Sequence, residues 1–173
     1  MAAVKVLQVV GFKNSGKTTL TLNLLKQAKY KGKKVSTIKH HGHGGSLELP
    51  SAETDSMRSF EEGADCSIAY GGGVVQLHQR RQEATLDELI ALASMGNPDL
   101  VLVEGFKEAG YEKIVLLRSA EDWVELQQLK QIALVVTPEI LGLDKIPMVL
   151  QNDSKQMQSW FTNWMDGDRN ESI

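Results

Sequence analysis

Hydrophobic positions along the chain alternate between two spacings. Short aliphatic runs, typical of buried strands, are separated by segments in which apolar residues recur every three or four positions, as on one face of a helix. Strands are predicted at Val4–Val10, Val35–Lys39, Leu100–Val103, Ile114–Leu117 and Ile132–Val136. Helices are predicted from Leu20 to Ala28, with Gly32 as C-terminal cap, from Pro50 to Ala64, from Thr85 to Ala93, from Trp123 to Leu129, and in the tail through Trp160 and Trp164.

A glycine triplet lies between two further strand-like segments, Ser67–Tyr70 and Val74–His78, and predicts an antiparallel hairpin. We expect this hairpin at the edge of an otherwise parallel sheet. Strands that alternate with helices predict a three-layer α/β fold with a mostly parallel sheet. Length predicts a single domain over residues 1–165, followed by a polar, frayed tail over residues 166–173.

Composition excludes several classes of protein. With 42% hydrophobic and 24% charged residues, the chain is neither disordered nor of low complexity. No aliphatic run approaches the roughly 20 residues of a membrane helix, and the opening residues do not resemble a signal peptide. A single cysteine, Cys66, excludes an intrachain disulfide and predicts a reducing, cytoplasmic compartment. We expect Cys66 to be a small buried hydrophobe at the start of a strand.

Charge is divided unevenly along the chain. Residues 1–47 hold nine lysines and no Asp, Glu or Arg, whereas residues 48–173 carry a net charge of −12, so that the formal total is −3. Most of these lysines lie near the end of the first predicted helix, where they complement the helix dipole and face water. The excess therefore favours a mononucleotide site with a few lysines over a nucleic-acid groove.

One motif carries most of the chemistry. Gly11 to Thr18 match G-x-x-x-x-G-K-[ST], directly after a predicted buried strand and directly before a predicted helix. In that position, backbone N–H groups converge on an anion, a lysine reaches the β/γ-phosphates and a hydroxyl binds Mg2+. The residues predicted to bind nucleotide are Gly11, Phe12, Lys13, Asn14, Ser15, Gly16, Lys17, Thr18 and Thr19.

A carboxylate is expected as a second metal partner. Glu104 ends the aliphatic strand that starts at Leu100, and the ends of parallel strands border the ligand crevice. Glu104 would hold Mg2+ with Thr18 or position water, and the Gly105 N–H would approach the γ-phosphate. The alternative is a strand-end acid that caps the following loop.

Three of the four histidines fall in one segment. His40, His41 and His43 follow Lys39 directly after the second predicted strand. Contact with an anionic substrate, a polar surface loop and a zinc site are all open, although no cysteine lies nearby to complete a structural zinc site. Asp55 and Arg58 lie three positions apart on the following helix, where a surface ion pair is the simplest interpretation.

Four segments together resemble the molybdopterin-guanine dinucleotide biosynthesis protein B (MobB) family. They are GFKNSGKTTL (11–20), IKHHGHGG (38–45), TDSMRSFEEGAD (54–65) and LVLVEGFKEAGYEKIVLLR (100–118). The resemblance implies a small, often dimeric GTP-binding protein with weak GTPase activity that assists the enzyme joining a guanosine nucleotide to molybdopterin. It also implies nucleotide contacts at residues 12–19 and metal roles for Thr18 and Glu104. Molybdopterin or partner contacts are implied around His40, His41, Asp55, Arg58 and Lys107.

Two features depart from related nucleotide-binding proteins. Guanine-specific GTPases present N-K-x-D after a late strand, but here that strand ends in Thr137-Pro138, and the later Asn152-Asp153 lacks the lysine. Guanine preference is thus implied by the resemblance alone. Phe12 occupies the place of the additional lysine found in related ATPases, so catalysis by a lysine acting across a dimer is not supported.

The expected function is a GTP-binding accessory factor of molybdenum-cofactor synthesis, with slow, Mg2+-dependent hydrolysis that uses Lys17 and Glu104. A homodimer is expected, with molybdopterin or its guanylyltransferase as partner and without nucleic-acid or membrane partners. The alternatives are a small-molecule kinase or ATPase that uses the same loop, and a nucleotide-dependent scaffold without catalysis.

Overall fold

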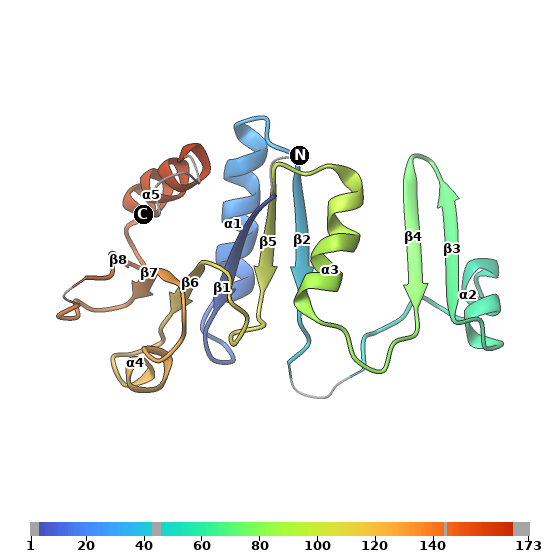
Figure 1. Cartoon of the computed structure of the whole chain (residues 1–173), viewed down its shortest axis with the longest axis horizontal. Coiled ribbons are helices and arrows are strands. Elements are labelled where there is room, and N and C mark those ends of the chain that lie inside the picture. The colour runs from blue at the N-terminus through green and yellow to red at the C-terminus, as the bar shows by residue number, and fades with distance from the viewer. Residues whose placement is uncertain (1–3, 43–45, 144, 168–173) are drawn as a thin grey trace. The chain divides into compact units, whose positions relative to one another are not determined.

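The computed structural model describes residues 4–42, 46–143 and 145–167. The chain divides into two compact units, one of residues 1–42 and 86–173 and a smaller one of residues 43–85. Figure 1 shows the elements of each unit, which are described separately below.

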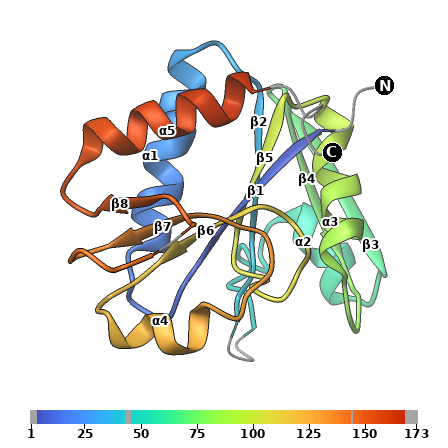
Figure 2. The same ribbon diagram turned by 60° about the vertical axis from the view of Figure 1, so that its left-hand side comes forward.

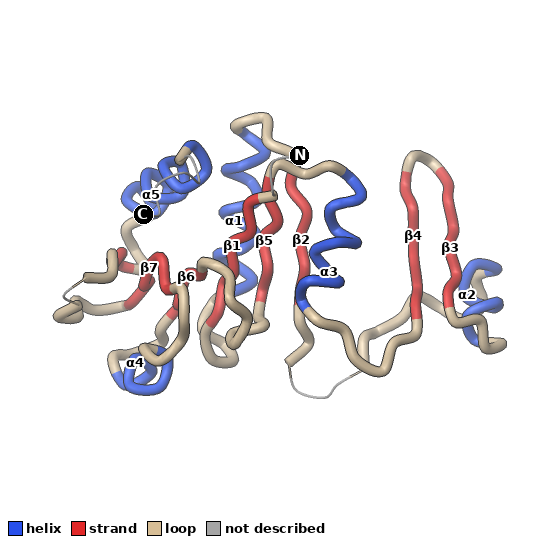
Figure 3. The backbone as a smooth tube through the Cα atoms, viewed as in Figure 1, coloured by secondary structure: helices blue, strands red, loops and turns tan. Residues whose placement is uncertain are grey.

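Within the described residues of the larger unit, six parallel strands form one sheet in the order β2-β5-β1-β6-β7-β8. β1 is therefore central, with β5 on one side and β6 on the other; Figure 3 shows the strands in red. The strands are β1 (Lys5–Val10), β2 (Val35–Lys39), β5 (Leu100–Glu104), β6 (Lys113–Leu116), β7 (Ile132–Thr137) and β8 (Met148–Leu150).

Helices cover both faces of this sheet (Figure 2). On one face, Leu7 and Val9 share a buried cluster with residues of α1 (Lys17–Tyr30) and α5 (Ser154–Asp166). On the other face, Val6 packs with α3 (Leu86–Ala93), which leads into the short 3-10 helix η1 (Ser94–Gly96), and Val10 packs with α4 (Glu121–Leu126). Alternate residues of β1 thus enter opposite cores, because side chains alternate across a strand. The predicted three-layer α/β fold is confirmed.

The predicted cap at the end of the first helix is present. Gly32 has φ 74°, and its N–H donates to Lys29 O while Lys33 N donates to Ala28 O. This paired arrangement is the Schellman motif, in which glycine accommodates the left-handed residue without steric cost.

The smaller unit contains one helix and one hairpin, namely α2 (Asp55–Glu61), β3 (Cys66–Gly71) and β4 (Val74–Gln79). Gly72 and Gly73 have φ values of 57° and 79°, the pattern of a tight type I′ turn. The antiparallel pairing is confirmed, but its predicted place is wrong, because β3 and β4 form a separate two-stranded sheet and not an edge of the parallel sheet.

Three local predictions are also corrected in detail. Cys66 does begin a strand, but it is exposed, since β3 lies outside the large sheet. The helix predicted from Pro50 begins only at Asp55, after Thr54 in an extended conformation. The strand β8 was not predicted, because three residues after Pro147 are too few to show a periodic pattern.

No helix in the described ranges is both long enough and apolar enough to span a membrane.

Candidate functional site

The segment of residues 11–18, termed the glycine-lysine loop, follows β1 at the carboxyl edge of the sheet and includes the first two residues of α1. A Cβ added to Gly11 would lie 2.4 Å from Leu116 O, so only glycine lets the loop approach β6 this closely. Asn14 and Gly16 have φ values of 61° and 92°, and these left-handed residues shape the turn into the helix. The buried Ser15 Oγ has no hydrogen-bond partner within the described chain, and it is thus a polar group available inside the loop.

The side chain of Lys17 returns over this loop. Its Nζ donates to Phe12 O at 2.6 Å. Burial lowers the pKa of Lys17 below its ordinary value of 10.5; Glu104 opposes this shift, while Lys39 and Arg118 add to it. Burial makes the charged form of Lys17 less favourable, and a bound anion would offset this cost. Binding an anion is the role predicted for Lys17.

Thr18, Glu104 and Lys39 form a compact polar triangle. Thr18 Oγ1 lies 2.9 and 3.0 Å from the two carboxylate oxygens of Glu104. Lys39 Nζ lies 3.1 Å from Thr18 Oγ1 and 3.4 Å from Glu104 Oε1. Three elements, α1, β5 and β2, therefore bring these side chains to one point, as expected for Thr18 and Glu104 from the sequence.

The donor set of this triangle fits Mg2+. A hydroxyl and a carboxylate are hard oxygen ligands, and a protein commonly supplies only one or two of them to Mg2+, with waters and phosphates completing the shell. Glu104 is 8% exposed, so its charge is largely shielded from water and its contacts are made to Thr18 and Lys39. Thr18 and Glu104 are the residues that would hold the ion.

The segment after β5 is tightly constrained. Gly105 has φ 99° and Phe106 has φ 54°. The N–H of Gly105 donates to Val9 O, whereas the sequence placed it near the γ-phosphate. The buried Gln8 side chain donates from Nε2 to the carbonyls of Gly105 and Phe106 at 2.9 and 2.8 Å. Gln8 was not predicted as part of the site, although a glutamine within an aliphatic strand was a usable signal.

The histidine segment lies beside this constrained turn. The His40 ring stacks on Phe106 with centroids 4.3 Å apart, and His40 N donates to Glu104 O. His40 therefore contacts the turn next to the predicted metal ligand. His41 is exposed, and His43 lies outside the described residues. Across the described ranges, no group of three or more His, Cys, Asp or Glu side chains is arranged to hold a metal ion.

The remaining predicted contacts are surface ion pairs. Arg58 Nη1 lies 3.6 Å from Asp55 Oδ1 in the smaller unit, and both side chains are exposed. Lys107 Nζ lies 3.3 Å from Glu125 Oε1 in the larger unit. Lys13 and Asn14 are exposed in the glycine-lysine loop, and Thr19 is exposed on α1.

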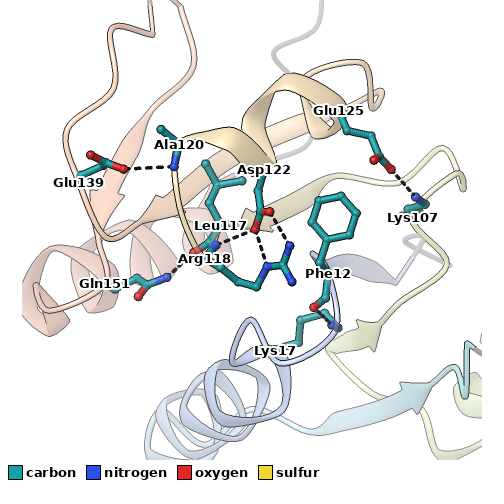
Figure 4. A network of polar contacts seen from close by, with 10 residues as sticks. All are labelled: Phe12, Lys17, Lys107, Leu117, Arg118, Ala120, Asp122, Glu125, Glu139 and Gln151. Carbon is teal, nitrogen blue, oxygen red and sulfur yellow. Dashed lines mark hydrogen bonds and ion pairs between the residues drawn. The ribbon is translucent and has the colours of Figure 1, made fainter.

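Arg118, which belongs to none of the predicted site residues, lies close to Phe12 of the glycine-lysine loop (Figure 4). Arg118 donates from Nε and Nη2 to the two carboxylate oxygens of Asp122 at 2.9 and 2.7 Å. Its guanidinium carbon lies 4.9 Å from the centroid of the Phe12 ring. The hydrogen bonds from Arg118 lower the pKa of Asp122, which is buried and charged.

Two polar residues near the strand ends beyond β6 have partners within the chain. Thr137 Oγ1 is buried and donates to Glu139 O. Asp153 accepts from Gln156 N as the N-cap of α5. Asp153 thus serves as the N-cap of a helix.

Fold and site together define a parallel α/β protein with a glycine-rich strand–loop–helix motif at the carboxyl edge of its sheet. The sequence model of the family described as molybdopterin guanine dinucleotide synthesis protein B, MobB, matches residues 6–138. The chain belongs to this MobB family, as the resemblance indicated.

Individual relatives agree with this assignment. The chain is 42% identical over 130 residues to the probable molybdopterin-guanine dinucleotide biosynthesis adapter protein of Bacillus subtilis, covering 75% of each chain. The crystal structure of Bacillus subtilis MobB is similar with a TM-score of 0.80 and 33% identity over 95% of this chain and 99% of that one. A MobB protein homolog from Bacillus stearothermophilus has a TM-score of 0.76 and 37% identity over 92% and 97% of the two chains.

Proposed function

We propose that this chain is a GTP-binding adapter protein in molybdopterin-guanine dinucleotide biosynthesis, with slow Mg2+-dependent GTPase activity. The observation that carries the proposal is the contact between Thr18 and Glu104 beside a glycine-lysine loop, in a member of the MobB family. Relatives that are 42% and 29% identical are named as adapter proteins of this biosynthesis.

Different groups of the glycine-lysine loop would contact different parts of a triphosphate. Backbone N–H groups at the start of α1 face the anion, aided by the helix dipole. Lys17 supplies a cation whose burial is offset by the phosphate charge. Bound Mg2+ would neutralise charge that develops on the phosphate oxygens when water attacks.

Hydrolysis is expected to be slow because the best placed carboxylate is already engaged. Glu104 accepts from Thr18 and pairs with Lys39, so it serves the metal site and is a poor base for water. Such a protein keeps its nucleotide long enough for the bound state to act as a signal to a partner.

Candidate contacts with molybdopterin or its guanylyltransferase are Lys39, His40 and His41, with His43 in the same segment. Lys39 is half exposed, precedes the histidine segment and forms an ion pair with Glu104. A change at Glu104 on nucleotide binding could therefore be passed to a partner that contacts Lys39. Gly105 and Lys107 continue the turn that contacts His40, and Asp55 and Arg58 remain candidates in the smaller unit.

An apolar face on the hairpin supports the expected homodimer. Ile68 pairs with Leu77 and Tyr70 with Val75, so the four side chains share one face. All four are exposed, and exposed apolar patches of this kind commonly mark interfaces.

Co-purification with the guanylyltransferase that attaches guanosine nucleotide to molybdopterin tests the function directly. The tagged chain should retain that enzyme when GTP and Mg2+ are present and lose it with GTP omitted, or when His40 and His41 are both alanine. If the enzyme is retained equally with and without GTP, a scaffold that acts independently of nucleotide would be favoured. Rapid ATP-dependent phosphorylation of a small acceptor would overturn the proposal in favour of a kinase.

A further inference from the structure

Hydrogen bonds to Asp122 fix the orientation of the Arg118 side chain, and most of its N–H groups remain available for another acceptor. Two guanidinium N–H groups bind Asp122, whose carboxylate also accepts from the Arg118 backbone N. A guanidinium has five N–H donors, so three remain for another acceptor, since the described chain offers Arg118 no other hydrogen-bond partner. The Arg118 side chain is 48% exposed, against 7% for Asp122, so a rigid donor faces accessible space.

The candidate metal ligands indicate how a nucleotide would lie. Thr18 and Glu104, the residues that would hold Mg2+, lie on the side of β1 that carries β5 and β2. Because Mg2+ would neutralise the terminal phosphates, these phosphates would lie on that side of β1. The nucleoside is attached at the opposite end of the triphosphate, so it would extend across β1 toward the ends of β6 and β7. Phe12 and Arg118 stand at that end of β6.

Three described carboxylates on this side already have hydrogen-bond partners. Asp122 binds Arg118, Glu139 accepts from Ala120 N at 3.2 Å, and Asp153 caps α5. Among the described residues on this side, Arg118 combines a fixed orientation with spare donors. A donor of this kind pairs with acceptors on the base.

Guanine and adenine differ in that respect. Guanine presents two neighbouring acceptors, O6 and N7, which match the fork of an arginine, whereas adenine replaces O6 with an amino donor. Resting on the proposed GTP binding, we propose that Arg118, oriented by Asp122 and the Phe12 ring, reads O6 and N7 of the base and gives this chain its preference for guanine. It would replace the aspartate that reads guanine in the N-K-x-D pattern.

Base analogues test the inference on the unaltered protein. GTP, ITP, 7-deaza-GTP and ATP are titrated by calorimetry into the purified full chain with Mg2+. ITP keeps O6 and N7 and should bind nearly as well as GTP. ATP and 7-deaza-GTP should each bind at least about fivefold more weakly, since each lacks one of the two acceptors. Weak ITP binding together with normal 7-deaza-GTP binding would overturn the inference, because ITP lacks only the 2-amino group of GTP and the result shows that this group is read instead.

Variants then assign the preference to Arg118. Arg118→Ala should reduce GTP affinity to that of ATP, while ATP affinity changes much less. Arg118→Lys keeps the charge but loses the fork, so it should also lose most of the preference. Lys155→Ala removes an exposed charge on α5 as a control and should leave the GTP-to-ATP ratio unchanged. A wild-type ratio in Arg118→Lys would contradict the assignment.

The two proposals fail differently. If the chain binds no nucleoside triphosphate, both fail. If it binds GTP with a preference that Arg118→Lys and 7-deaza-GTP leave unchanged, only the role of Arg118 fails and the GTP-binding adapter stands.

Discussion

Thr18 and Glu104 are 86 positions apart in the sequence, yet Thr18 Oγ1 lies within 3.0 Å of both carboxylate oxygens of Glu104. The register of the sheet causes this meeting. Val9 of β1 pairs with Glu104 of β5, so the carboxylate stands beside the loop that begins two residues after Val9. Both residues project at the carboxyl edge, where ligands of parallel α/β sheets bind.

Glu104→Gln should separate metal binding from nucleotide binding. The amide keeps an acceptor for Thr18 but loses the negative charge, so affinity for Mg2+ in the GTP complex should fall about 10- to 100-fold, as when a metal site loses a supporting group. GTP affinity measured in EDTA should not change. Glu53→Gln, an exposed position in the smaller unit, is the control. Unchanged Mg2+ dependence in Glu104→Gln would contradict the metal assignment.

Gly105→Ala should destabilise the fold. A Cβ at Gly105 would lie 2.9 Å from His40 Cβ, and φ 99° is unfavourable for alanine, so the free energy of unfolding should fall by about 1–3 kcal/mol. Gly110→Ala is the matched control, because no atom lies within 4 Å of its added Cβ. Urea denaturation of both variants checks this, and equal stabilities would show that the turn is not constrained as described.

Lys113 gives a pH-dependent prediction. It is fully buried, donates to Ala109 O and Lys130 O at 2.6 and 2.7 Å, and has a pKa lowered below 10.5 by burial, with Glu108 in opposition. Between the folded pKa and 10.5, the unfolded chain binds more protons, so this lysine makes stability rise with pH in that window.

Lys113→Met removes this contribution. The stability of the wild type relative to Lys113→Met should therefore increase as the pH rises through the alkaline range, measured by urea denaturation at successive pH values. Parallel stability curves would show that burial leaves the protonation of Lys113 unaffected.

Much of the large unit could be predicted because its pattern is local. Each central strand is covered on both faces, which produces continuous aliphatic runs such as Val4–Val10, and α1 carries its own cap at Gly32. The hairpin was also local, since the triplet Gly71–Gly73 supports the turn. Its separation from the large sheet depends on strand pairing, which no local pattern records.

Only the part of the candidate site that lies in recognisable motifs could be predicted from the sequence. The glycine-lysine loop and Glu104 follow from spacing at strand ends. Phe12 and Arg118 come into contact only because β1 pairs with β6. No local sequence pattern records this pairing, so the contact could not be predicted. An arginine four positions before Asp122, just after a strand, was the available signal.

Binding of GTP to the wild type and to Lys17→Ala tests the central claim most directly. Lys17 is partly exposed and Lys17→Ala should fold normally by circular dichroism. Calorimetry with Mg2+ should give clear GTP binding for the wild type and none, or a loss of at least about 100-fold, for Lys17→Ala, because the cation on the β/γ-phosphates is removed. Equal GTP affinity in the two proteins would contradict the assignment of the glycine-lysine loop as the nucleotide site.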